Sequence, residues 1–338
     1  MNRVLGVDSG GSGLRIALGL ARGGPGETAV RTAGVVTTAE PVRTGAGGID
    51  AEHLLEQVVP AARKLLADAD AASPSSAAGG QRVGRLAAVA VGAAGMATLG
   101  DDLRARLPGA LLDALGVPRL VLAADAVTAY AGALGRRPGA VVAAGTGMIA
   151  LGTDLVRWRR ADGWGHLLGD SGGGAWIGRA GLDAAMRAYD GRRGGSPALL
   201  ARAEAVLGPA PELPGLLYPR TDRAAVLASF APEVAACAGD DPVADGILAE
   251  AAGHIVDCAA AVCPASGACR VALTGGLFGI GAPLLAPVRA RLAARLPHAS
   301  LADAAGDPLA GALTLAAALA AGAPLLPLDP RLLSVTHP

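Results

Sequence analysis

Apolar residues in the first part of the chain alternate or run together between glycine-rich breaks, a pattern typical of short strands. Residues 3–8, 13–20 and 28–36 form three such segments joined by short turns, so the sequence predicts an antiparallel meander. After Asp50, which can cap a helix, apolar residues recur at helical spacing as far as Leu66. The chain is therefore expected to open with three strands and a helix.

Strands then alternate with helices. A Ser-, Gly- and Pro-containing loop at residues 71–81 precedes a buried strand at 86–91, a helical region around 101–115 and another strand at 120–123. This alternation predicts a partly parallel sheet.

The second half opens in the same style as the first. Strands near 140–144 and 148–152 flank Gly145-Thr146-Gly147, and a later strand at 270–274 ends at a Gly-Gly break. Residues 191–195 and 209–214 are predicted as loops. Two halves that each begin with a strand, a glycine turn and a strand indicate a duplicated α/β lobe.

Length and charge narrow the class of protein. A chain of 338 residues can form two lobes with cores of their own, and 29 acidic residues balance 29 basic ones. No net field attracts nucleic acid or an anionic membrane, so small molecules are the expected partners.

Two segments bear on localisation. Met1 to Arg3 lead directly into a strand rather than into a secretion signal, so a cytoplasmic protein is expected. Residues 309–328 carry no charge and approach the length of a membrane span, but glycines and prolines interrupt them. Because Asp307-Pro308 is typical of a helix start, we predict a buried core helix of about four turns.

The cysteines give no pattern of their own. The paired two-residue spacing of zinc and redox sites is absent, and ordinary buried thiols are predicted at Cys237, Cys258, Cys263 and Cys269.

The first glycine-rich turn could bind phosphate. Residues 6–13 read Gly-Val-Asp-Ser-Gly-Gly-Ser-Gly, in which Asp8 ends a strand and bare backbone follows. Amides and the Ser12 hydroxyl could hold phosphate oxygens, and Asp8 could hold hydrated magnesium. A structural glycine-rich hairpin is the alternative. The Lys of a Walker loop is missing, and a strand rather than the helix of a dinucleotide fingerprint follows.

Two further features could complete a phosphoryl-transfer site. Gly145-Thr146-Gly147 could grip phosphates as a second turn, although a plain turn has the same sequence. Asp125 ends a strand and precedes a helical run, so it is either a helix N-cap or the base that accepts a proton from a substrate hydroxyl.

The stretch from Gly163 to Gly174 has the features of a ligand loop. Gly163-Trp164-Gly165-His166 and Asp170 lie in a glycine-rich segment that is costly to order, and its backbone and carboxylate could bind sugar hydroxyls. His166 is either a catalytic group or a structural residue that holds the loop in place. Later, Thr274-Gly275-Gly276 between a strand and a helix leaves room for adenosine.

Taken in order, these motifs, with Asp-Pro-Leu-Ala-Gly-Ala at 307–312, resemble the N-acetylglucosamine kinase branch of the acetate and sugar kinase/actin-like ATPase superfamily. The ATPase subunits of benzoyl-CoA reductase and the activators of 2-hydroxyacyl-CoA dehydratases lie beside this branch. The resemblance implies two actin-like, ribonuclease H-like lobes, at 1–120 and 121–338, with an interlobe active-site cleft. It also implies a homodimer that uses ATP and magnesium to phosphorylate the 6-hydroxyl of an amino sugar, N-acetylglucosamine first.

The same resemblance implies roles for individual residues. Asp125 is the expected catalytic base and Asp8 the expected metal-binding residue. The expected ATP-binding residues are Gly10, Gly11, Ser12, Gly145, Thr146, Ala228, Gly275 and Gly276. The expected substrate-binding residues are Thr38, Asp125, Thr146, Gly163, Trp164, Gly165 and Asp170.

Three departures from the family pattern leave the substrate open. Residues 36–40 lack the usual sugar-binding Asn, Ser12-Gly13-Leu14-Arg15 replaces a Thr-Lys-Thr type of ending, and Met148 replaces a polar residue. Glucosamine and N-acetylmuramic acid are other possible acceptors. The alternative functions are an ATPase that activates a CoA-ester reductase or dehydratase through a shared iron–sulfur cluster, and a non-catalytic sugar-responsive binding protein.

Overall fold

The computed structural model describes residues 1–10, 13–24, 27–38, 40, 42–45, 48–72, 85–265 and 269–336. These residues pack as two compact units. Unit 1 contains Met1–Arg137, Leu155–Trp158 and Ala304–Pro338, and unit 2 contains Pro138–Asp154 and Arg159–Asp303.

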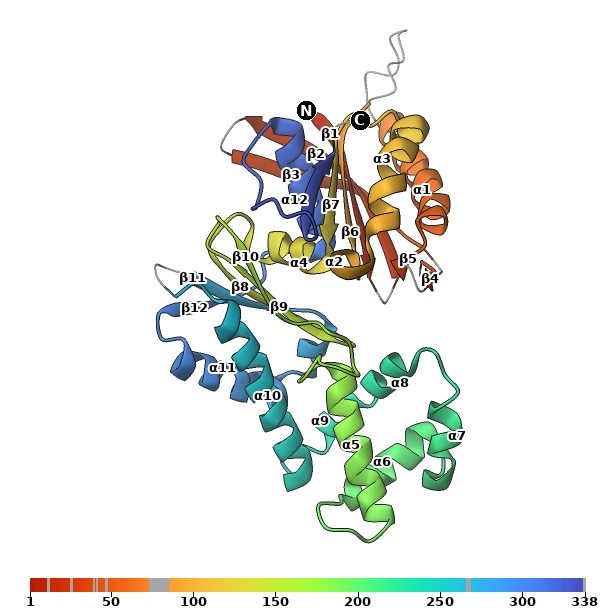
Figure 1. The fold of residues 1–338 in the computed structure, drawn as a ribbon, viewed down its shortest axis with the longest axis vertical. Helices are drawn as coiled ribbons and strands as arrows, with labels where there is room; N and C mark the ends of the chain where they lie inside the picture. The colour runs from red at the N-terminus through yellow and green to blue at the C-terminus, as the bar shows by residue number, and fades with distance from the viewer. Residues whose placement is uncertain are drawn as a thin grey trace. The chain divides into compact units, whose positions relative to one another are not determined.

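Unit 1 is built on a six-stranded sheet in the order β13-β7-β6-β1-β2-β3 (Figure 1). The first three strands form the predicted antiparallel meander, and β6 and β7 run parallel to β1, which confirms the partly parallel sheet. Strand β13 closes the far edge antiparallel to β7. The strand bounds are β1 (Asn2–Gly10), β2 (Gly13–Gly24), β3 (Glu27–Thr37), β6 (Leu86–Ala93), β7 (Leu120–Ala124) and β13 (Leu333–Thr336).

Helices cover both faces of this sheet. Helices α1 and α3 pack together on one face, and α4 and α12 on the other (Figure 1). Helix α1 begins where the sequence predicts, because the Asp50 carboxylate accepts hydrogen bonds from the backbone N–H groups of Glu52 and His53. The bounds are α1 (Ala51–Ala71), α2 (Met96–Leu99), α3 (Asp101–Leu115), α4 (Asp125–Leu134) and α12 (Pro308–Ala321), with a small hairpin of β4 (Thr44–Gly45) and β5 (Gly48–Ile49).

Glycines let helix α12 approach its neighbours closely. A Cβ on Gly6 of β1 would lie 2.9 Å from the backbone nitrogen of Leu313, and one on Gly311 would overlap the carbonyl oxygen of Thr128 on α4. The helix is largely buried, as predicted for the uncharged segment. In the described part of the chain, no helix is both long and apolar enough to cross a membrane.

Unit 2 repeats the strand pattern of unit 1. Its sheet has the order β10-β9-β8-β11-β12, in which β8 pairs antiparallel with β9 and parallel with β11, as β1 does with β2 and β6. This repetition confirms the duplicated lobes. The bounds are β8 (Gly139–Ala144), β9 (Met148–Thr153), β10 (Trp158–Asp162), β11 (Cys269–Thr274) and β12 (Ala299–Ala302).

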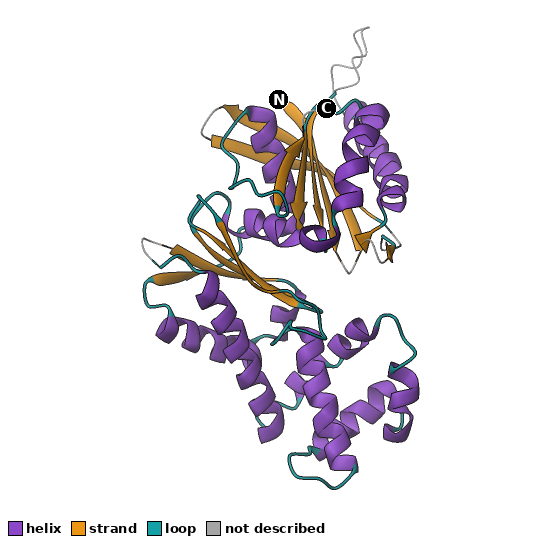
Figure 2. Cartoon of the chain, viewed as in Figure 1, coloured by secondary structure: helices purple, strands orange, loops and turns teal. Residues whose placement is uncertain are grey.

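A group of helices makes up most of unit 2 outside its sheet (Figure 2). Helix α10 packs on β8, β9 and α11, while α5 packs on α6, α8 and α9. Part of the predicted loop at 209–214 is instead helical. Pro211 and Pro214 lie in the first turns of two short helices, where the missing N–H of proline breaks no helical hydrogen bond. The bounds are α5 (Gly174–Tyr189), α6 (Pro197–Leu207), α7 (Leu213–Leu217), α8 (Arg223–Ser229), α9 (Ala231–Ala236), α10 (Pro242–Val262) and α11 (Ala282–Arg295), with 3-10 turns η2 (Ala210–Glu212) and η3 (Gly276–Ile280).

The compact units differ from the expected division at residue 120. Strand β7 pairs with β6, and its following helix α4 packs against α12, so both belong to unit 1. The sequence pattern does not show that the C-terminal segment from Ala304 returns to the first sheet.

Because α12 and α4 approach closely, we predict that one added methyl group between them lowers the stability of the fold. We expect Gly311→Ala to lower the free energy of unfolding by about 1–3 kcal/mol, because the new Cβ overlaps Thr128. The control Gly109→Ala in α3 meets no atom within 4 Å and should raise it by about 0.5–1 kcal/mol. Urea unfolding measures the stability of both variants. Equal changes in the free energy of unfolding would contradict the close packing of α12 on α4.

Candidate active site

Asp8 lies near the carboxyl end of β1, in the middle of the unit 1 sheet. It is opposite Arg15 of β2 and opposite Gly92 of β6 in the strand registers. The residue is 8% exposed, so its charge needs a partner close by.

Asp125 follows the carboxyl end of β7. Because Gly92 of β6 is opposite both Asp8 and Ala123, the two aspartates reach the same edge of the parallel strands, with β6 between them. Ala124 rather than Asp125 is the N-cap of α4, which corrects the N-cap alternative by one residue. The Asp125 Oδ1 atom accepts a hydrogen bond from the Ala126 N–H at 2.8 Å, which fixes the carboxylate at the first turn.

Arg15 joins Asp8 to the start of helix α12. Its Nη2 and Nε atoms lie 2.6 and 3.2 Å from Asp8 Oδ2, and Nη1 lies 2.6 Å from Asp307 Oδ2. Asp307 is the N-cap of α12, and its Oδ1 accepts from the Ala310 N–H. One guanidinium therefore fixes both a site carboxylate and a helix start that are far apart in the sequence.

This network moves the two carboxyl pKa values in opposite directions. Burial raises the pKa of Asp8 more than the hydrogen bond and charge of Arg15 lower it, and Asp307 adds to the rise. Burial also acts to raise the pKa of Asp307, but the hydrogen bonds from Ala310 and Arg15 and the charge of Arg15 outweigh it, so its pKa is lowered. Asp8 is therefore the carboxylate that is costly to keep ionised.

The other predicted residues of unit 1 lie near the same turn. Gly10 is opposite Gly13 at the end of the β1–β2 hairpin, whereas Gly11 and Ser12 lie outside the described residues. Thr38 follows β3, where its N–H donates to the Leu14 carbonyl and its hydroxyl donates to the Glu40 carbonyl. The structure thus places Gly10 and Thr38 near Arg15 rather than elsewhere in the unit.

In unit 2, the Gly145–Gly147 turn caps a helix. The backbone N–H groups of Gly174 and Ala175, at the start of α5, donate to the carbonyl oxygens of Gly145 and Thr146 at 2.9 and 2.8 Å. Within the turn, the Gly145 N–H donates to the Gly147 carbonyl. The turn is therefore ordered by the helix that follows the ligand loop.

The predicted nucleotide residues of unit 2 gather around this turn. A Cβ on Gly174 would lie 2.6 Å from the Gly145 oxygen and 3.1 Å from the Cβ of Ala228, and one on Gly275 would overlap Ala144. Gly276 starts the 3-10 turn η3 directly afterwards. Small residues thus leave backbone exposed on several segments at one place in the unit.

Asp162, which the sequence reading did not single out, organises the glycine-rich loop. Its two carboxylate oxygens accept from the N–H groups of Asp170 and Ser171 at 2.6 and 3.0 Å. Asp170 Oδ1 in turn accepts from the Gly165 N–H at 3.1 Å. Asp162 and Asp170 both have positive φ angles, of 58° and 55°, a backbone state that Asp tolerates better than most residues.

Asp170 also lies against the phosphate-turn candidate. A Cβ on Gly147 would overlap its carboxylate, so only glycine fits there. Burial raises the pKa of Asp170 more than the Gly165 hydrogen bond lowers it, and the charge of Asp162 adds to the rise. A buried carboxylate with a raised pKa in a ligand loop is typical of a functional residue.

Arg160 is the second residue that sequence reading missed in this loop. Its guanidinium lies 4.5 Å from the centre of the Trp164 ring, and it donates to the carbonyl oxygens of Asp162 and Gly163 at 3.0 and 2.5 Å. Trp164 remains 61% exposed. The arrangement holds an aromatic face beside the backbone of Gly163 and Gly165, a surface suited to a sugar ring.

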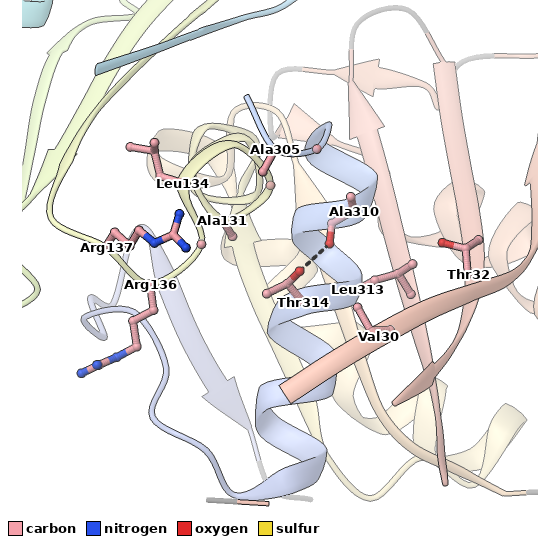
Figure 3. A pocket seen from close by; sticks show the side chains of 13 residues that line it. Val30, Thr32, Ala131, Leu134, Arg136, Arg137, Ala305, Ala310, Leu313 and Thr314 are labelled. Atoms are coloured by element: carbon pink, nitrogen blue, oxygen red, sulfur yellow. Dashed lines mark hydrogen bonds between the residues drawn. The ribbon is translucent and has the colours of Figure 1, made fainter. Parts of the chain in front are cut away.

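One pocket of about 370 Å³ lies elsewhere in unit 1, between α4, α12 and β3 (Figure 3). The Thr314 hydroxyl beside it donates to the Ala310 carbonyl of the preceding helical turn. Among the described residues, none of the predicted site residues lines this pocket. The candidate site therefore depends on the chemistry of the turns rather than on this cavity.

A family model for the BadF/BadG/BcrA/BcrD ATPase family matches residues 5–316, which includes most of both units and all of these turns. The chain belongs to this family. The sequence resemblance to the sugar kinase and reductase-ATPase superfamily is thereby confirmed.

Relatives of the chain include sugar kinases. An N-acetylmuramic acid/N-acetylglucosamine kinase of Clostridium acetobutylicum is 33% identical over 115 residues, which are 33% of this chain and 37% of that relative. The match therefore spans little more than a third of the length of the curated relative.

Solved structures resemble the chain over most of its length. A candidate N-acetylglucosamine kinase from Chromobacterium violaceum matches with a TM-score of 0.63 and 29% identity, covering 93% of this chain and 98% of that one. A ROK-family glucokinase from Streptomyces griseus, solved with glucose and AMPPNP, has a TM-score of 0.52 and 21% identity and covers 93% and 98%. These likenesses confirm the predicted α/β fold class of two lobes.

Replacing Arg15 with Met tests the network at Asp8. We expect the free energy of unfolding to fall by about 1–2 kcal/mol at pH 8, less than for a fully buried pair because 35% of the Arg15 side chain is exposed. The deficit should shrink toward pH 4. There, protonation reduces the charge of Asp8, whose pKa is raised, whereas Asp307, whose pKa is lowered, stays ionised and keeps its part of the deficit.

Urea unfolding of both proteins at pH 8 and pH 4 measures this difference. The control Arg187→Met removes an exposed pair with Asp183 on α5 and should change stability by less than about 0.5 kcal/mol at either pH. A deficit of equal size at both pH values for Arg15→Met would show that the pairing with Asp8 is not its cause.

Proposed function

We propose that the protein is an ATP-dependent sugar kinase that transfers the terminal phosphate of ATP to the 6-hydroxyl of an amino sugar, N-acetylglucosamine first. The observation that carries this proposal is the placement of Asp8 and Asp125 at one edge of the parallel strands of unit 1, in a chain of an ATPase family. Phosphoryl transfer needs mainly positioning and charge neutralisation, and carboxylates so placed can serve both.

Asp125 is the proposed general base. Its position at the first turn of α4, with Oδ1 held by the Ala126 N–H, gives the carboxylate a fixed direction. It would accept the proton of the 6-hydroxyl while that oxygen attacks the terminal phosphorus and ADP leaves.

Asp8 fits magnesium as the family implies. Magnesium at nucleotide sites keeps several waters and uses one or two carboxylates, and both hydrogen bonds from Arg15 reach only Oδ2 of Asp8. Asp8 would hold hydrated magnesium through Oδ1, with Arg15 fixing the orientation of the carboxylate. The ion would neutralise charge on the phosphates, and Gly10, Gly11 and Ser12 would contact them.

The proposed roles in unit 2 follow from its backbone. Gly145 and Thr146 would contact phosphate, while Ala228, Gly275 and Gly276 leave space for adenosine. Gly163, Trp164, Gly165 and Asp170 would bind the sugar, with Thr146 and, from unit 1, Thr38 as further contacts. Ordering of the loop by Asp162 and Arg160 before ligand arrives lowers the entropy cost of binding.

The amino sugar is proposed from relatives in two comparisons. The C. acetobutylicum relative is named for two N-acetylated sugars, and the C. violaceum structure for one. Residues 36–40 lack the usual Asn, and the Thr38 hydroxyl already donates to the Glu40 carbonyl, so glucosamine and N-acetylmuramic acid are tested as other acceptors. A homodimer is also proposed, from the family resemblance alone.

A coupled ADP-release assay with magnesium, ATP and a panel of hexoses and amino sugars tests the function. We expect release that depends on an N-acetylated amino sugar and a kcat about 10²–10⁴-fold lower in Asp125→Asn, because the amide cannot accept the proton. The control Asp113→Asn changes an exposed aspartate of α3 in the same unit and should keep the wild-type kcat.

Two other outcomes would each replace the proposal. ADP release without any sugar would favour the reductase-activating ATPase. Saturable sugar binding without ADP release would favour a sugar-responsive binding protein.

A further inference from the structure

A cluster of soft metal ligands lies in unit 2, apart from the candidate active-site residues. The sulfur atoms of Cys263 and Cys269 are 2.7 Å apart, and a ligating nitrogen of His298 lies within 4.8 Å of both. Cys263 caps the end of α10, Cys269 begins β11, and His298 immediately precedes β12. Three segments thus bring together side chains that their sequence spacing does not connect.

The histidine makes a backbone hydrogen bond of the kind that metal-binding histidines make. Its Nε2 atom lies 3.0 Å from the carbonyl oxygen of Pro264, and a carbonyl oxygen can only accept, so Nε2 carries the hydrogen. In the neutral imidazole, Nδ1 then has the free lone pair. Metal-binding histidines commonly donate their other ring N–H to a backbone carbonyl in this way.

Exposure of the three residues also suits an ion at the surface of the unit. Cys263 and Cys269 are 4% and 2% exposed, whereas His298 is exposed. An ion could therefore enter beside the histidine and reach thiols that solvent hardly contacts.

We propose that Cys263, Cys269 and His298 bind a soft divalent cation, with Zn²⁺ as the best match. Two thiolates and an imidazole are ligands that Zn²⁺ prefers, and solvent would supply the fourth. Zn–S bonds of 2.3 Å at tetrahedral angles need sulfur atoms about 3.8 Å apart, so the two cysteine side chains must rotate apart by about 1 Å on binding. Each cysteine releases one proton to solvent as its sulfur binds.

The position indicates a structural metal site rather than a catalytic one. Cys269 is at the amino end of β11, whereas the proposed nucleotide turn at Gly275 follows the carboxyl end of the same strand. A bound ion would join the end of α10 to the start of β11 and to the residue before β12. We therefore expect Zn²⁺ to stabilise the fold without being needed for proton transfer at Asp125.

Metal content of the purified full-length chain tests the proposal. The chain is reduced with a phosphine until four free thiols are counted, stripped with EDTA, and titrated with Zn²⁺ against a chromophoric chelator. We expect one Zn²⁺ per chain in the wild type, at least tenfold weaker binding in His298→Ala, and a Tm that rises with Zn²⁺. Titration with Co²⁺ should give a sulfur-to-metal charge-transfer band.

The matched controls are the other two cysteines. Cys237→Ser and Cys258→Ser should keep the site, whereas Cys263→Ser and Cys269→Ser should lose the Co²⁺ band. His298→Ala changes an exposed side chain and so keeps the test valid if a buried cysteine variant fails to fold. Absence of Zn²⁺ binding with four free thiols, unchanged affinity in His298→Ala, or a Cys263–Cys269 disulfide that persists under the phosphine would overturn the proposal.

Discussion

The shared guanidinium of Arg15 is the interaction on which the unit 1 site depends. Asp8 is 8% exposed and lies where charge is costly, and Arg15 places a cation 2.6 Å from it. The same side chain reaches Asp307 at the start of α12. Glycines allow this helix to pack closely on β1 and α4. The position of the carboxylate is therefore coupled to the packing of the core, and this coupling fixes the carboxylate before any ligand arrives.

Much of the architecture follows from local signals. The three opening strands, the helix capped by Asp50 and the helix after Asp307 lie where periodicity and capping residues predict them. So does the glycine turn between β8 and β9, since a strand that ends at a short glycine break has few other conformations available. The repeated strand order of the two units explains why the halves of the sequence resemble each other.

The contacts that organise the candidate site could not be predicted in this way. Arg15 and Asp307 are 292 residues apart, and no local pattern relates them. Asp162 and Arg160 lie just before the recognised loop, and their roles depend on backbone groups that only the folded loop presents. Cys263, Cys269 and His298 lack a familiar ligand spacing because separate segments bring them together. Tertiary structure, rather than propensity, decides each of these positions.

The most direct test of the proposed chemistry is the identity of the phosphorylated product. Phosphorus-31 and carbon-13 NMR of the protein with N-acetylglucosamine, ATP and magnesium would follow the terminal phosphate of ATP. A sugar kinase with Asp125 as base predicts a single phosphate ester on the 6-oxygen, formed in equal amount to ADP. Inorganic phosphate without an ester, or an ester on another sugar oxygen, would contradict it.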